Sequence, residues 1–400
     1  MTRAQQELPT AHRGRGFALV AYAFAVTMLG TTLPTPLYPI YQAEYGFSPL
    51  TITVIFAVYA AGVIAGLVLV GPLSDQIGRR RVLLPGVLVA ALAAVVFLLP
   101  GGLPALLTAR VLSGISAGVF TGTATATLLD LAPRDRRNRA GLVAAAVNMG
   151  GLGLGPPVAG LLAQYAPEPL ALCFVVDLVL VLLAALGLRA VPETVERPER
   201  PRLRPQRLSV PAETRPTFVR AVIAGFAGFA VLGLFTAISP SFLGQVLGVH
   251  NHAAVGFVVF SLFAASTVGQ VLASLTHRRR ALLAGCLVLA AGAACIAASL
   301  VAVSLLLLVV GAVVAGLGQG ASFRSALTEV GNAAPATQRA EVSSSFFVAI
   351  YVAISLPVVG VGALQQAVGL VPAGIGFAAV IGLLALAAFA GLVRHEEPAA

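Results

Sequence analysis

Long apolar stretches, separated by short segments rich in turn-forming and charged residues, dominate this chain of 400 residues. A helix needs about 20 mostly apolar residues to cross a bilayer. Stretches of about that length lie between the clusters of Pro, Gly and Arg at 16–40, 49–71, 82–100, 104–130, 140–165, 169–189, 217–246, 253–275, 281–301, 304–330, 341–366 and 370–392. The pattern predicts an all-α integral membrane protein with twelve transmembrane helices.

Composition and charge support the same class of protein. The chain is 58% hydrophobic and 10% charged, whereas a soluble domain is about half apolar and about a quarter charged. Its net charge of +10 comes from arginine, which gathers at both termini and in alternate connections between the stretches. By the positive-inside rule, these connections and both termini lie in the cytoplasm. The charge therefore indicates a topology in the cytoplasmic (inner) membrane and no nucleic-acid partner.

An internal repeat divides the chain into two halves. Gly114 and Gly118 recur as Gly316 and Gly320, and Asp130-Leu-Ala-Pro as Asn332-Ala-Ala-Pro, both at an offset of 202 residues. The repeat predicts two pseudo-symmetric halves of six helices with a substrate site between them. The predicted parts are a tail at 1–15, an N-terminal half at 16–190, a Pro- and Arg-rich cytoplasmic linker at 191–216, a C-terminal half at 217–393 and a tail at 394–400.

The connection between the second and third stretches carries Gly-x-Leu-x-Asp-x-x-Gly-Arg-Arg-Arg, which begins at Gly71. It resembles the loop-2/3 signature of the major facilitator superfamily of transporters at each defining position. The resemblance implies a conformational latch that holds the outward-open state, formed by Gly71, Asp75, Gly78, Arg79, Arg80 and, at the end of the fourth stretch, Asp130. We expect Gly71 to allow close helix approach and Gly78 to allow a turn. The alternative is that these residues only mark topology in a solvated loop.

Three further stretches carry motifs that resemble those of the twelve-span drug/proton antiporters. In the fifth stretch the motif consists of Gly151, Gly155, Pro156 and Gly160, where small residues let helices pack closely. In the first stretch it surrounds Gly30 and Pro34. In the fourth stretch Arg110, with Gly114 and Gly118, resembles a motif associated with proton transfer. The alternative for Arg110 is a structural arginine that bonds carbonyl groups of the first stretch.

Proton antiport requires a carboxylate whose pKa burial raises towards neutral pH. Asp177 is the only acid well inside a stretch, so Arg110 and Asp177 are the coupling candidates. Asp177 has the alternative of a structural role. Aromatic and polar side chains on the helices expected to face the cavity are candidates for substrate contact and suit neutral or weakly cationic amphiphiles: Tyr22, Thr31, Tyr59, Asn148, Phe229, Gln270, Gln319 and Tyr351.

These observations together favour a secondary active transporter that exports small, mostly apolar or amphiphilic compounds by alternating access, with protons as the coupling ion. A transporter of a polar metabolite such as a sugar, or a membrane sensor or scaffold without transport, is the alternative. The sequence shows no catalytic cluster and no metal-ligand spacing, and its three cysteines lie in apolar runs. We therefore expect no enzyme activity, no metal and no cofactor, and a monomer in the bilayer.

Overall fold

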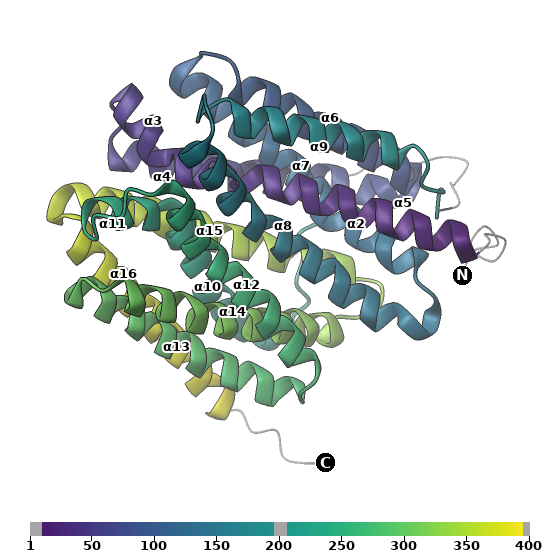
Figure 1. Ribbon diagram of the computed structural model, residues 1–400. Helices are drawn as coiled ribbons and strands as arrows, with labels where there is room; N and C mark the ends of the chain where they lie inside the picture. Colours follow the sequence, from purple (N-terminus) through teal and green to yellow (C-terminus); the bar gives the residue numbers. More distant parts are fainter. Residues whose placement is uncertain (1–9, 196–205, 395–400) are drawn as a thin grey trace. The chain divides into compact units, whose positions relative to one another are not determined.

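The computed structural model describes residues 10–195 and 206–394, and in these ranges the regular structure is helical throughout (Figure 1). The described helices before residue 196 are α2 (Thr10–Thr32), η1 (Thr35–Leu37), α3 (Tyr38–Tyr45), α4 (Pro49–Ala65), η2 (Gly66–Val70), η3 (Gly71–Leu73), α5 (Ser74–Ile77), α6 (Arg79–Phe97), α7 (Gly102–Leu131), η4 (Arg134–Arg136), α8 (Arg137–Tyr165) and α9 (Leu172–Leu188). Those after residue 205 are α10 (Arg215–Ala237), α11 (Ser239–Gln245), α12 (His252–Ser274), α13 (Arg278–Ala302), α14 (Leu305–Ala333), α15 (Arg339–Val368) and α16 (Leu370–Arg394).

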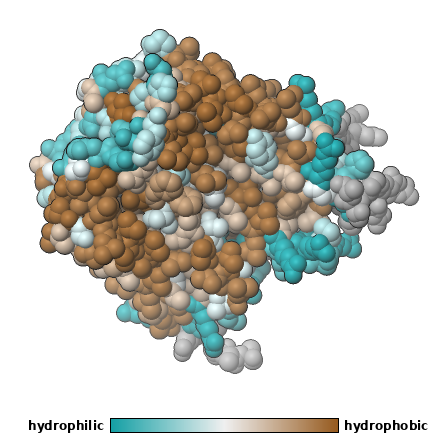
Figure 2. Space-filling model, in the orientation of Figure 1, coloured by the Kyte–Doolittle hydropathy of each residue, from teal (hydrophilic) through white to brown (hydrophobic). Residues whose placement is uncertain are grey.

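Most of these helices have the length and composition of membrane spans. Among the described residues, 11 helical segments are long and apolar enough to cross a bilayer, and α9 is a shorter apolar helix of 17 residues. Large apolar side chains are exposed along the helices, for example Leu182, Leu183 and Leu186 of α9, and apolar residues cover much of the visible face in Figure 2. The prediction of an all-α membrane protein with twelve transmembrane helices is confirmed.

The chain forms two compact units, which do not follow a single cut in the sequence. The first unit contains Met1–Leu37 and Val58–Arg207, and the second contains Tyr38–Ala57 and Leu208–Ala400. The segment Tyr38–Ala57 belongs to the second unit because α3 packs against α11 and Thr53 of α4 lies against Gly362 of α15. The predicted domain boundaries follow the sequence repeat instead and stay a prediction.

The repeated glycines make the same kind of helix crossing in both units. In the first unit, Gly114 and Gly118 of α7 lie against backbone carbonyl groups of α4. In the second unit, Gly316 and Gly320 of α14 lie against backbone carbonyl groups of α12. A side chain at any of these positions would collide with the neighbouring backbone, so each crossing depends on glycine. The equivalent contacts show the pseudo-symmetry of the two six-helix halves.

A third glycine crossing joins α2 to α8. A Cβ atom at Gly151 would lie 2.5 Å from the carbonyl oxygen of Ala25, and one at Gly155 would lie 2.5 Å from that of Leu29. Beside this contact, the Thr32 hydroxyl donates a hydrogen bond across the helices to the carbonyl oxygen of Leu152, at 2.7 Å. The motif of the fifth span is therefore a contact surface for the first span.

We predict that Gly155→Ala destabilises the protein by about 1–3 kcal/mol, because the new methyl group overpacks the crossing against backbone atoms that have little room to move. Gly150→Ala is the matched control in the same helix, since a Cβ atom there meets nothing within 4 Å in the described part of the chain. The measurement is thermal unfolding of both purified variants in detergent. Equal melting temperatures would contradict the predicted crossing.

Candidate functional site

Two clusters of polar side chains stand out in the first unit, and the first surrounds Arg79 at the start of α6. The Arg79 guanidinium pairs with Asp75 of α5 at 2.6 Å and with Asp130, in the last turn of α7, at 3.2 Å. It also donates to the Ser74 hydroxyl at 2.7 Å. The Arg79 side chain is 12% exposed, whereas that of Asp75 is 65% exposed. One guanidinium thus ties the loop between α4 and α6 to the end of α7.

Glu193 completes this cluster, and the sequence reasoning did not identify it. Its carboxylate accepts the backbone N–H groups of Arg79, at 2.7 Å, and of Thr194, at 3.1 Å. An anion at a helix N-terminus is favourable, and here it also faces the arginines that open α6. Arg80 in turn donates to the carbonyl oxygens of Arg189 and Val191. The start of the predicted linker is therefore part of the cluster, and residues 196–205 of that linker lie outside the described residues.

The two glycines of the loop have different roles. Gly78 has a φ of 111°, a conformation that few other residues adopt, and a Cβ atom there would overlap the Glu193 carboxylate. Gly71 has ordinary helical angles, and a Cβ atom there would meet nothing within 4 Å in the described part of the chain. The expectation that Gly71 allows close helix approach is wrong, because no other helix of the described residues comes within 4 Å of a Cβ atom at this position.

The second cluster lies deep in the first unit, around Arg110 of α7. Its side chain is 2% exposed, donates to the carbonyl oxygen of Thr31 at 2.6 Å and lies 4.6 Å from the centre of the Tyr59 ring. The hydroxyl groups of Tyr59 and Thr31 are close neighbours. A structural arginine that bonds carbonyl groups of the first span was the alternative expected for Arg110, and the bond to Thr31 is of this kind. The cation–π contact with Tyr59 holds the guanidinium further in place.

Asp177 of α9 lines a cavity that Thr31 also lines. Its side chain is 5% exposed, and its Oδ1 atom has no hydrogen-bond partner among the described residues. The carboxylate reaches α2 because residue 30 is glycine: a Cβ atom there would lie 2.7 Å from Asp177 Oδ2. A cavity of about 10 Å³ adjoins the carboxylate, and its hydroxyl-bearing lining residues are Thr27, Thr31 and Ser113. The two coupling candidates thus approach each other through Thr31.

The predicted substrate-contact residues divide between the units and differ in their surroundings. In the first unit, the Tyr22 hydroxyl donates to the carbonyl oxygen of Leu180 at 3.2 Å, and the Oδ1 atom of Asn148 has no partner among the described residues. Thr31 and Tyr59 belong to the cluster around Arg110. Tyr22 is therefore directed at α9, which places it in helix packing.

The predicted residues of the second unit are largely buried. Gln319 accepts a hydrogen bond from the Ser266 hydroxyl at 2.5 Å, and the side-chain amide of Gln270 has no partner among the described residues. The ring centres of Phe229 and Phe323 are 5.0 Å apart, edge to face. Tyr351 is 7% exposed. Buried amides with unused donors and acceptors are groups that a polar ligand can satisfy.

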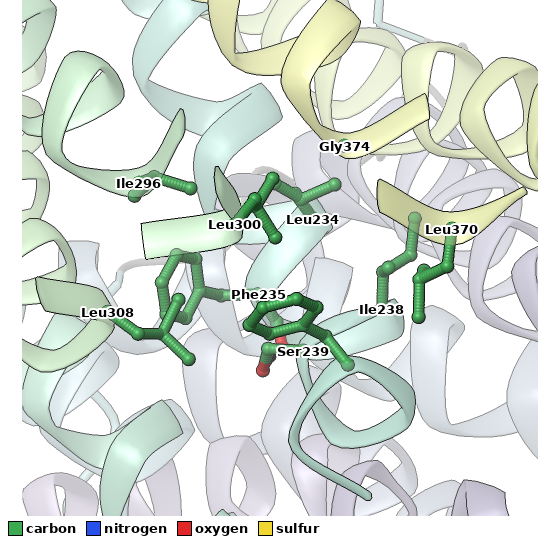
Figure 3. A pocket seen from close by; sticks show the side chains of 10 residues that line it. Leu234, Phe235, Ile238, Ser239, Ile296, Leu300, Leu308, Leu370 and Gly374 are labelled. Carbon is green, nitrogen blue, oxygen red and sulfur yellow. Dashed lines mark hydrogen bonds between the residues drawn. The ribbon is translucent and has the colours of Figure 1, made fainter. Parts of the chain in front are cut away.

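An apolar pocket of about 30 Å³ lies elsewhere in the second unit, among α10, α11, α13, α14 and α16 (Figure 3). Leucine, isoleucine and phenylalanine side chains form most of its wall. Ser239 is the one hydroxyl residue among those that line it, and its hydroxyl is occupied by the carbonyl oxygen of Phe235 at 2.5 Å. None of the predicted substrate-contact residues lines this pocket. Its chemistry suits an apolar group.

Comparison with known sequences gives one family and partial relatives. Residues 20–358 match the family model of the Major Facilitator Superfamily. Over 160 residues the chain is 29% identical to the candidate multidrug resistance protein MdtD of Escherichia coli. This aligned region covers 40% of this chain and 34% of that protein. The MdtD of Shigella sonnei matches to the same extent. The chain thus matches about a third of the length of these curated relatives.

Solved structures of transporters share the fold. A bacterial homologue of the human lysosomal transporter Spinster, in an inward-facing and unoccupied conformation, has a TM-score of 0.76 at 16% identity and covers 98% of this chain and 100% of its own. A POT family transporter in complex with 5-aminolevulinic acid has a TM-score of 0.77 at 13% identity, with coverages of 99% and 100%. At these identities the likeness shows the fold alone.

We predict that Gly78→Ala destabilises the first unit by about 1–3 kcal/mol, because it forces a side chain into a positive φ and against the Glu193 carboxylate. Gly71→Ala is the control in the same loop and should leave stability within about 0.5 kcal/mol of the wild type. Thermal unfolding in detergent measures both. If Gly71→Ala lowered the melting temperature as much as Gly78→Ala, the difference between the two glycines would be refuted.

Proposed function

The chain belongs to the major facilitator superfamily of membrane transporters, and from this we propose that it exports small, mostly apolar or amphiphilic compounds in exchange for protons. The observation that carries the proposal is Asp177, a carboxyl group buried in a span without an ion-pair partner among the described residues. Ionisable groups in such positions are costly and mark ion pathways. The name of the MdtD relatives and the apolar pocket of Figure 3 support the class of substrate.

The proposed coupling step is the gain and loss of one proton at Asp177. An unpaired carboxylate in a span carries a large desolvation cost, and a bound proton removes it. The occupancy of this single site therefore changes the energy of the first unit by a large amount. Arg110, joined to the same cluster through the carbonyl group of Thr31, is the nearby fixed cation. Alternating access between two states with different proton occupancy would couple the proton to the substrate.

The proposed latch consists of Asp75, Gly78, Arg79, Arg80 and Asp130, and we add Glu193 to it. Arg79 pairs with two carboxylates at once, and its backbone N–H is held by the third. Asp75 is largely exposed, so its ion pair contributes only about 0–1 kcal/mol to folding stability. Its proposed role is to set the balance between conformations. The arginine connections, and with them both termini, are proposed to lie on the cytoplasmic side.

A transporter of a polar metabolite such as a sugar is the second candidate. The observation that favours it is the buried side-chain amide of Gln270, whose nitrogen and oxygen have no partner among the described residues, together with the unpartnered nitrogen of Gln319. A sugar hydroxyl could satisfy such groups. Purified protein in proteoliposomes, with an imposed pH gradient and with apolar dyes and sugars assayed side by side, distinguishes the two candidates. Gradient-driven flux of sugars without flux of dyes would replace the first proposal by the second.

We predict that Asp177→Asn abolishes gradient-driven accumulation of substrate but keeps substrate binding and downhill exchange. The substitution removes the proton site with little change in volume. The measurement is substrate flux in proteoliposomes with and without a proton gradient, and equilibrium binding of the same substrate serves as the control for folding. Undiminished accumulation by Asp177→Asn would exclude this carboxyl group as the proton carrier.

We predict that Asp75→Asn reduces transport at least about tenfold while the protein stays folded in the membrane, because it removes one charge of the latch without much change in volume. Asp135→Asn is the matched control, since Asp135 is 76% exposed and its pairing with Arg136 is long, at 3.7 Å. Flux and the amount of folded protein are measured for both variants. Near-normal flux in Asp75→Asn, or an equal loss in Asp135→Asn, would rule out the latch.

A further inference from the structure

The cavity beside Asp177 has the size and the chemistry of a site for one water molecule. Its volume of about 10 Å³ is about that of one water-sized probe. Two buried oxygens, Asp177 Oδ1 and Thr27 Oγ1, belong to its lining residues and have no hydrogen-bond partner among the described residues. Buried polar atoms are nearly always satisfied by protein or by ordered water. A single water molecule between the two oxygens would satisfy both.

Thr31 connects this cavity to the cluster around Arg110. It lines the cavity, and its hydroxyl donates to the carbonyl oxygen of Met28 at 2.7 Å. The same hydroxyl is a close neighbour of the Tyr59 hydroxyl. The oxygen of Thr31 can accept bonds while it donates one. Tyr59 in turn lies two residues beyond the point at which α4 passes from one compact unit to the other. Oxygen-bearing side chains of α9, α2 and α4 are thus successive neighbours, from Asp177 through Thr31 to Tyr59.

We propose that one water molecule binds between Asp177 and Thr27, and that the Thr31 hydroxyl relays the coupling proton between this water and Tyr59. The carboxyl group passes its proton to the water, and the water passes one to Thr31 Oγ1. Thr31 then releases its own proton to the Tyr59 oxygen, and the Tyr59 hydroxyl proton passes to a solvent water molecule. The carboxyl group thus loses one proton, the solvent water gains one, and each oxygen between them gains one proton and loses one. For this the Thr31 hydrogen turns away from the Met28 carbonyl group. This relay rests on the proposed proton exchange at Asp177 and adds the route that the proton follows.

The helices packed around Asp177 place their other charged and titratable groups outside the cavity in the described part of the chain. Helix α6 contributes alanine and phenylalanine side chains to the cavity, and α7 contributes Ser113. Arg110 of α7 is held at the Thr31 carbonyl group, and Tyr22 of α2 is bonded to Leu180, about one turn along α9. Cys173 lies one turn before Asp177 on α9 itself. The titratable residues of α8, namely Arg137, Arg139 and Tyr165, lie at the two ends of that helix.

The test is the rate of hydrogen–deuterium exchange at the Asp177 carboxyl group, followed by infrared spectroscopy of the purified protein. The band is assigned by its loss in Asp177→Asn. Thr31→Val removes the hydroxyl but keeps the side-chain shape and the carbonyl group that holds Arg110. We expect exchange to slow roughly a hundredfold, with the pH titration of the band unchanged, and Thr31→Ser to restore the rate. Thr127→Val is the control, because Thr127 is buried on α7 and bonds Thr123 within its own helix.

Tyr59→Phe interrupts the other end of the relay while it keeps the ring under Arg110, and it serves as the second variant if Thr31→Val fails to fold. Wild-type exchange rates in the folded variants, or the absence of a protonated Asp177 band between about pH 4 and 9, would overturn the relay. Slowed exchange without gradient-driven flux in the wild type would support the relay and reject proton-coupled export. Gradient-driven flux with unchanged exchange would do the reverse.

Discussion

Close approach of helix backbones at glycine is the interaction on which the rest of the structure depends. Lipid gives little hydrophobic drive to helix association, so tight packing has to supply it. At Gly114, α7 packs directly against the backbone of Tyr59. Arg110 lies one turn before Gly114 on the same helix. The crossing therefore brings the guanidinium over the Tyr59 ring. The crossing of α2 and α8 likewise fixes the helix that carries Thr27, Gly30 and Thr31.

In the first unit, helix packing also brings partner groups to the arginines of the interior and of α6. In the interior, Arg110 is satisfied by a carbonyl group and a ring. At the ends of the helices, three arginines open α6, where a helix dipole disfavours positive charge. Asp75, Asp130 and Glu193 compensate them, and each of these acids comes from a different segment of the chain. The loop is thus held by acids that converge from before α6, from the end of α7 and from beyond α9.

Most of the fold could be predicted from the sequence, because a bilayer requires every span to be a long apolar helix. The motif glycines of the fourth and fifth spans and the arginine Arg110 could also be recognised in the sequence. Few residue types fit a close helix crossing, and a charged residue inside a span stands out. Glu193 could not be predicted from local pattern, since it meets Arg79 across 114 residues. An acid directly after a span, on the side where the arginines gather, was the available signal. The cavity at Asp177 is lined by residues of four helices, so the pattern of one helix cannot predict it. The role expected of Gly71 was wrong because the spacing of a motif does not determine which way its loop faces.

The division of α4 between the two compact units has a mechanical consequence. The chain passes between the units twice in this region. At the first passage, next to η1, Pro34 and Pro36 interrupt the helical ladder. At the second passage, between Ala57 and Val58, the helix is continuous. A continuous helix resists bending more than a backbone interrupted by proline, so the second passage is the stiffer of the two links. The helical backbone of α4 runs unbroken from this second passage to Tyr59 and on to Ala65, so the passage and the ring that lies under Arg110 belong to one rigid element.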